Sequence, residues 1–315
     1  MTRLIWPLLL CLFLLLPTAA LAEEEIPYLL TASAKGDVET VKALLNSGAN
    51  PNTKDAEGIS ALMYAARKGN AEVLRALLDK GAEINFKDAG GWTALMFAAK
   101  KNHIDAVKVL LEKGADTSVR DESGWSALGL AASSGYSDIV GLLVDAGVNP
   151  NARADDGRSV LMYAAKGGDV PTIKTLIDKG ADLSVRDRYG ATAAMICARE
   201  GHLDALKLLL DSGARLEDRD NTKWTALTWA VKKNHLPVAQ LLLDRGADPN
   251  VADSQGLPLL HYAVDTGSVE MVKLLLDKGA KVKAKDQYGL TALVYAMKQQ
   301  HPDIVRVLKE AGGSY

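Results

Sequence analysis

The chain has 315 residues, of which 48% are hydrophobic and 5% aromatic, and its formal net charge at pH 7 is −2. A nearly neutral chain has no overall field that would attract nucleic acid or an anionic membrane, so its charge has to be analysed surface by surface. Two cysteines, Cys11 and Cys197, are too few for a disulfide framework.

Residues 1–22 are predicted to be a secretory signal peptide. Arg3 precedes an apolar run from Leu4 to Leu16, and Ala20 and Ala22 form the Ala-x-Ala pattern that signal peptidase recognises. The run is short for a transmembrane helix, and nothing later in the chain is apolar enough to span a bilayer. We therefore expect cleavage after Ala22 and no membrane insertion afterwards.

The chain that remains after this cleavage has one cysteine, Cys197, and no Asn-x-Ser/Thr glycosylation site. Exported proteins of eukaryotes are commonly held together by disulfides, which this chain does without. These features favour the periplasm of a bacterium as its location. The export signal also argues against a nucleic-acid partner more strongly than the charge does.

A period of 33 residues organises the rest of the chain. The segment 88–120, DAGGWTALMFAAKKNHIDAVKVLLEKGADTSVR, nearly repeats itself in both directions without insertions. The frames open at Asp55, Asp88, Asp121, Ala154, Asp187, Asp220, Asp253 and Asp286. A fixed period of this size is typical of a solenoid, and a turn followed by two helices is what 33 residues provide.

Each frame carries turn, helix-cap and helix-end residues at the same positions. The fourth position is a turn glycine in seven frames, where a positive φ is expected, and Lys223 replaces it in the frame of Asp220. We expect that turn to differ or to be strained. The sixth position is Ser or Thr, which predicts a helix N-cap, except at Pro258. Glycine or asparagine between the helices predicts a left-handed link, and a glycine ends each second helix.

These residues resemble the ankyrin repeat family over essentially all of the chain after residue 22. The resemblance implies an all-α solenoid of about nine helix-turn-helix units joined by short β-hairpin loops. It divides the chain into a capping repeat at 23–54, seven repeats at 55–285 and a capping repeat at 286–315. The first helix departs from the family pattern, because Thr-Pro-Leu-His is replaced by sequences such as Thr-Ala-Leu-Met at 93–96. Only His261 keeps the family's histidine, and methionine packing is expected to replace its hydrogen bonds elsewhere.

The sequence does not predict a catalytic or metal site. His103, His202, His235 and His301 share one position at the start of the second helix. Equivalent positions in neighbouring repeats lie roughly 10 Å apart, too far for two ligands of one zinc. We expect each histidine to bond the loop of the next repeat. Asp residues recur at the frame starts, where turn bonding explains them, and before the helix-end glycines, where a solvated surface does. No cofactor is expected, and the chain is expected not to be an enzyme.

The resemblance places a partner-binding surface on the concave side, along the hairpin tips and the exposed face of the first helix. The candidate aromatic residues there are Trp92, Trp125, Tyr189, Trp224 and Tyr288. Exposed Trp and Tyr are enriched at binding hot spots. Alternatively, each Trp lies flat over the neighbouring hairpin and only packs. Trp92 and Trp125 are favoured as a binding pair because their repeats are adjacent.

Two rows of basic residues are predicted on the same side. One row ends the frames, at Lys54, Lys87, Arg120, Arg153, Arg186, Arg219 and Lys285. The other lies at the end of the first helix, at Arg67, Lys100, Lys101, Lys166, Arg199, Lys232, Lys233 and Lys298. These rows indicate a groove for an acidic partner. The alternative is that each frame-end cation pairs with the Asp that follows it, as in Lys87–Asp88, Arg120–Asp121 and Arg186–Asp187, which explains only the first row.

We therefore predict a monomeric, non-enzymatic interaction protein of the cell envelope that binds another protein through its concave face. A second hypothesis is a binder of a non-protein envelope ligand, such as a peptidoglycan fragment or an anionic polymer, with Trp faces stacking on sugars.

Overall fold

A computed structural model of the chain describes residues 27–314. The predicted signal peptide at 1–22, with its cleavage site, lies outside these residues, as does the start of the predicted capping repeat. Within 27–314 the chain forms 18 α-helices, and its only β-structure is four isolated bridges. The predicted hairpin loops are therefore tight turns with at most one bridge each, such as Lys54 with Ser60. Among these residues no helix combines the length and apolar character needed to cross a bilayer.

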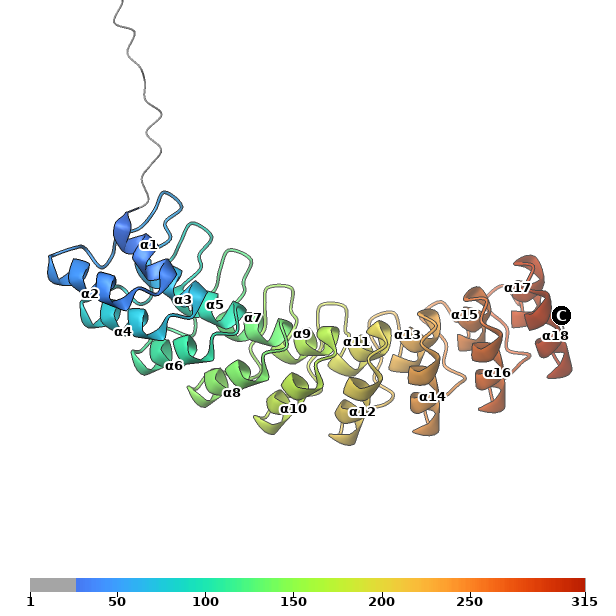
Figure 1. The fold of residues 1–315 in the computed structure, drawn as a ribbon. Coiled ribbons are helices and arrows are strands. Elements are labelled where there is room, and N and C mark those ends of the chain that lie inside the picture. The colour runs from blue at the N-terminus through green and yellow to red at the C-terminus, as the bar shows by residue number, and fades with distance from the viewer. Residues whose placement is uncertain (1–26, 315) are drawn as a thin grey trace, which may run out of the picture.

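The helices lie in two rows that follow an arc, with the odd-numbered row inside (Figure 1). The inner helices are α1 (Tyr28–Lys35), α3 (Ala61–Lys68), α5 (Ala94–Lys100), α7 (Ala127–Ser133), α9 (Val160–Gly167), α11 (Ala193–Glu200), α13 (Ala226–Lys232), α15 (Leu259–Asp265) and α17 (Ala292–Lys298). The outer helices are α2 (Val38–Asn46), α4 (Ala71–Asp79), α6 (Ile104–Glu112), α8 (Ser137–Asp145), α10 (Val170–Asp178), α12 (Leu203–Asp211), α14 (Leu236–Asp244), α16 (Val269–Asp277) and α18 (Pro302–Glu310).

The predicted helix starts are confirmed in six of the inner helices. A Ser or Thr side chain accepts a hydrogen bond from the backbone N–H three residues later, which satisfies one of the donors that a helix N-terminus leaves unpaired. These N-caps are Ser60, Thr93, Ser126, Ser159, Thr192 and Thr225. Thr291 is the exception, because its hydroxyl donates to the Ser314 carbonyl at 2.9 Å instead. Pro258 starts α15 without a side-chain cap.

A continuous core runs between the two rows of helices. The leucines of the inner helices, such as Leu62, Leu95 and Leu161, are buried, and so are the methionines that follow them. Leu74, Leu110 and their equivalents from the outer helices pack against the same layer. Each repeat therefore buries its apolar side against its neighbours, and the array grows in one dimension without a central core.

The turn at Lys223 keeps the conformation of the glycine turns. Its φ is +64°, against +79° at the equivalent Gly91, so the turn does not differ and the strain falls on the lysine. A side chain in this left-handed region costs about 1–2 kcal/mol. The alternative that this turn adopts a different shape is therefore wrong.

Lys223→Gly is expected to raise the free energy of unfolding by about 1 kcal/mol, since the relief of strain is partly offset by the freedom that glycine adds to the unfolded chain. Asn102→Gly is the matched control, because Asn102 has a φ of +60° but asparagine tolerates this region better. Urea unfolding measures both. If both variants gain the same free energy of unfolding, or if Lys223→Gly gains none, Lys223 is not strained.

Candidate functional site

The aspartate that opens seven of the eight frames fixes the turn on the inner side. Asp88 Oδ1 accepts the backbone N–H of Gly90 at 2.9 Å and of Trp92 at 2.8 Å. The same pair of bonds is made by Asp55, Asp121, Asp187, Asp220, Asp253 and Asp286. These carboxylates bind backbone N–H groups within the turn, as the sequence predicts. They hold the residue after the turn glycine in a constant place along the array.

The three tryptophans at that place are half-buried against other aromatic rings. Ring centroids are 5.1 Å apart for Trp92–Phe97, 4.4 Å for Trp125–Tyr163, 4.6 Å for Trp224–Trp229 and 5.2 Å for Trp224–Tyr262. Packing therefore occupies part of each indole, as the alternative interpretation expects. A role for the remaining edges in binding stays a prediction.

The two tyrosines of the candidate surface are open to solvent. Tyr189 is 63% exposed and Tyr288 is 76% exposed, both at the tip of a turn. The backbone carbonyl of Tyr189 accepts the N–H of Asn221 in the next turn at 3.0 Å, which holds the tip in place. Of the five aromatic candidates, these two offer the most free surface.

The eight basic residues at the ends of the inner helices, which we call the inner basic row, fall into two groups. Arg67 stacks on Tyr64, with 4.8 Å from its Cζ to the ring centroid. Arg199 is bound by its neighbour Glu200 at 2.9 Å, and Lys232 Nζ lies 3.7 Å from Asp265. The other five are exposed and make no ion pair among the described residues: Lys100, Lys101, Lys166, Lys233 and Lys298. Among these, Lys100 donates only to the Ser134 hydroxyl, at 3.0 Å.

Three arginines of the frame-end row neither stay free for an acidic partner nor pair with the next aspartate in the chain. Arg120 pairs with Asp155 at 3.5 Å and Arg186 with Asp218 at 2.7 Å, 35 and 32 residues further along the chain. The expected pairs with the next aspartate in the chain are wrong, because Arg120 and Arg186 reach other carboxylates and Asp187 pairs with Arg158 at 3.8 Å. Arg153 and Arg186 also donate to backbone carbonyls of the next repeat. These guanidinium groups are therefore largely occupied by contacts between repeats.

Four ion pairs join neighbouring outer helices, and we call these pairs the outer ladder. Its pairs join the end of one outer helix to the C-cap of the next: Asp79–Lys113 at 2.7 Å, Asp145–Lys179, Asp211–Arg245 at 2.7 Å and Asp244–Lys278 at 2.6 Å. The hydrogen bond from Lys113, with its charge, holds the pKa of Asp79 below its usual value. Aspartates at the helix ends therefore form ion pairs between repeats, which corrects the prediction that they only face solvent.

Three of the four histidines that share a position bond the preceding repeat, whereas the sequence predicts the next one. Nε2 of His103 lies 3.1 Å from the Arg67 carbonyl, and His202 and His235 make the same contact with Lys166 and Arg199. Because a carbonyl only accepts, Nε2 is the donor. The direction follows from the ring lying over the glycine link of the repeat before it.

A family model for ankyrin repeats, in copies of three, matches residues 29–121, 115–187, 161–253 and 245–315. These matches cover the chain from the first described helix to its end. The chain belongs to the ankyrin repeat family. No curated protein matches the sequence. Ankyrin repeats are in general modules of protein–protein interaction, so the family assigns a class of function and no partner.

The ankyrin array holds its one described cysteine as a core residue. Cys197 is fully buried in α11, and burial raises the pKa of its thiol to about 12. A thiol in this state is a poor nucleophile. Within residues 27–314 no three His, Cys, Asp or Glu side chains come together as metal ligands would.

The family histidine is retained at one place, His261, and is fully buried there. Its Nε2 donates to the Leu290 carbonyl at 3.1 Å, and its ring packs against Tyr295. Burial lowers the pKa of His261, although the bond to Leu290 and the charges of Asp286 and Asp265 act in the opposite direction. The unfolded chain therefore binds a proton more readily than the folded one. The burial of neutral His261 therefore adds to the free energy of unfolding above pH 6.5, and this contribution is lost as the pH falls below 6.5.

His261→Met is expected to remove part of the loss of stability between about pH 6.5 and pH 5. Methionine is the natural control residue, because Met63, Met96 and Met162 are buried at the same position in other repeats. Urea midpoints at pH 7.5 and 5.5 measure the effect. If the variant keeps the pH dependence of the wild type, His261 is not its source.

Proposed function

We propose that this ankyrin array is a non-enzymatic scaffold that binds an acidic partner protein on its inner face. The observation that carries the proposal is the set of lysines, without an ion pair in residues 27–314, that are aligned along its inner side. The outer ladder neutralises its charges in pairs, whereas five lysines of the inner basic row have no ion pair among the described residues. A row of unpaired cations on one side of a nearly neutral chain favours a partner of opposite charge.

The shape of the array supports the same face. The inner helices lie on the inside of the arc (Figure 1), so the inner basic row lines a surface that can curve around a partner. Tyr189 and Tyr288 add exposed aromatic surface at the turn tips. Tyrosine is among the residue types that binding hot spots favour, and the lysines supply the charge that attracts an acidic partner.

We propose the cell envelope as the setting, with the periplasm as the compartment and cleavage after Ala22. The support is the pattern of residues 1–22 and a stable fold that relies on repeat packing and has its cysteine buried at position 197. In this proposal the released chain is a monomer that is not inserted in the membrane.

A photo-crosslinking residue tests the face directly. With p-benzoylphenylalanine in place of Tyr189, which is solvent-exposed, cells are expected to yield a crosslinked species of defined mass on irradiation. The matched control places the same residue at Lys207, which is exposed on outer helix α12. Equal crosslinking from both positions, or from Lys207 only, would overturn the proposed face.

A further inference from the structure

The junction between α7 and α9 departs from the rest of the inner face. Gly129 occupies the position in α7 that holds a buried methionine in four other repeats, at Met63, Met96, Met162 and Met195. A Cβ on Gly129 would lie 3.2 Å from Cε3 of Trp125. The indole therefore rests against the backbone of α7, in space that the methionine takes elsewhere.

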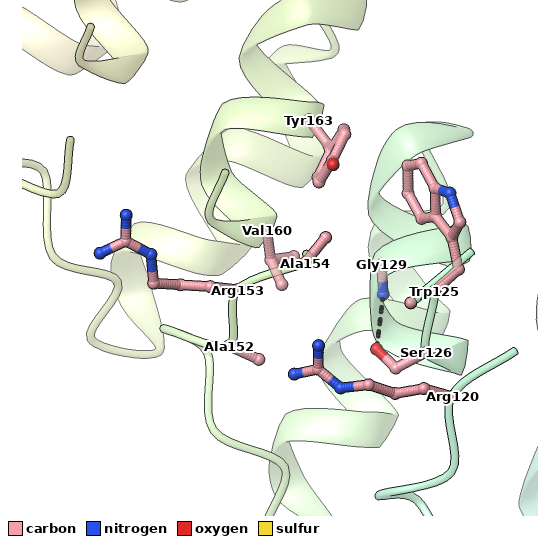
Figure 2. A pocket seen from close by; sticks show the side chains of 10 residues that line it. Arg120, Trp125, Ser126, Gly129, Ala152, Arg153, Ala154, Val160 and Tyr163 are labelled. Atoms are coloured by element: carbon pink, nitrogen blue, oxygen red, sulfur yellow. Dashed lines mark hydrogen bonds between the residues drawn. The ribbon is translucent and has the colours of Figure 1, made fainter. Parts of the chain in front are cut away.

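A second substitution lies opposite. The frame opens with Ala154 where the others have aspartate, so Tyr163 lacks the partner that its equivalent Tyr64 has in Asp55 at 2.7 Å. Asp156 is the carboxylate near Tyr163 instead, and burial together with this carboxylate raises the pKa of the tyrosine. Its ring faces Trp125 across the junction (Figure 2), with ring centroids 4.4 Å apart.

These substitutions leave an open hollow beside the two rings. It has a volume of about 540 Å³ and is lined by Ser123, Trp125, Asp156, Arg158, Tyr163 and Lys166, among others. Ligand clefts commonly measure about 300–1,000 Å³. Trp125 and Tyr163 also line a second, nearly filled void of about 10 Å³ beneath them, next to Gly129 and Val160 (Figure 2).

The charges of the hollow point to the group that it would accept. Arg158 is held between Asp156 at 3.6 Å and Asp187 at 3.8 Å, and Asp156 also accepts the backbone N–H of Arg158. This cluster is satisfied internally. Lys166 at the rim is exposed and has no ion pair among residues 27–314. The aromatic walls are therefore joined to one available cation.

We propose that this hollow is the specificity site of the inner face and receives one residue of the partner protein. An aromatic or large apolar side chain lies against Trp125 and Tyr163, and an adjacent carboxylate pairs with Lys166. The inference rests on the proposed function and adds the chemistry of the recognised segment. The ion pair with Lys166, partly desolvated in the complex, orients the partner segment. The two rings supply the apolar area against which its side chain packs.

Random peptides displayed on phage and selected on the chain from residue 23 onward provide the probe. Selected peptides are expected to place an aromatic or large apolar residue next to Asp, Glu or a free C-terminus. Lys166→Glu is expected to weaken them about tenfold or more, as is Gly129→Met, which displaces Trp125. The control Lys207→Glu on α12 should bind like the wild type. Lys166→Glu changes only an exposed side chain, so it keeps the test valid if Gly129→Met folds poorly.

Three outcomes overturn the specificity site. The specificity site is wrong if the selected peptides have no carboxylate. It is also wrong if they bind Lys166→Glu and Gly129→Met with the same affinity as the wild type. If such peptides are lost on Lys101→Glu or Lys233→Glu, the inner face binds elsewhere and the proposed function stands. If a peptidoglycan fragment binds the wild type but not Gly129→Met, the occupant is a glycan and the peptide assignment is wrong.

Discussion

Gly168→Ala is expected to lower the free energy of unfolding by about 2–3 kcal/mol, one of the largest effects of a single methyl group in this chain. Gly168 links α9 to α10 with a φ of +70°, where alanine is strained. A Cβ there would also lie 2.5 Å from Cγ of His202, which covers the link from the next repeat. The ring has to move, and its bond to the Lys166 carbonyl at 3.0 Å is lost with it.

Gly81→Ala separates the two causes. Gly81 has a φ of +84° but nothing lies within 4 Å of a Cβ built on it. Its loss should therefore be about 1 kcal/mol, from backbone strain alone. Urea unfolding of both variants gives the difference, which is the contribution of the histidine contact between repeats. Equal losses would show that His202 does not cover Gly168.

Reversing three charges of the inner basic row is expected to weaken partner binding by about 100-fold or more. The variant combines Lys101→Glu, Lys166→Glu and Lys233→Glu, three exposed residues without an ion pair among those described. Since they support no packing, its thermal melt should stay close to that of the wild type. Binding of the wild type should also fall as salt is added, because screening weakens exposed charge pairs.

The control for this variant reverses three charges on the outer helices, Lys108→Glu, Lys207→Glu and Lys273→Glu. It changes the net charge by the same amount on the other side of the array. Affinity for the crosslinked partner, measured by surface plasmon resonance, should remain within a few-fold of the wild type. Equal weakening by both variants would mean that net charge, and no particular face, governs the interaction.

The local features of this fold could be predicted from the sequence because each one is set by a few neighbouring residues. Asn102 and Gly69 mark left-handed links, and Thr93 marks a helix start, through backbone geometry that hardly depends on the rest of the chain. The period then repeats the result. The family follows from the same residues.

The contacts between repeats could not be predicted in the same way. Lys113 meets Asp79 and Arg120 meets Asp155, across 34 and 35 residues, while the pairing expected for Arg120 was with its neighbour in the chain. Which residues face each other depends on how one repeat is rotated on the next, and the period alone does not contain this rotation.

The candidate site shows the same division. The positions of Trp92, Trp125 and Trp224 on one strip follow from the frame, but their half-buried state depends on rings such as Phe97 and Tyr163 that approach them in space. Gly129 is visible in the sequence only as a missing methionine. Its consequence, an indole resting on the helix beside a hollow, needs the coordinates of two repeats.

Hydrogen exchange on the complex with the crosslinked partner tests the central claim most directly. Binding through the inner face predicts the largest slowing at the turn tips around Tyr189 and Tyr288 and at the ends of the inner helices near Lys101, Lys166 and Lys233. The outer helices α6, α8, α10 and α12 should exchange as they do in the free chain. Slowing that is confined to the outer helices would contradict the account.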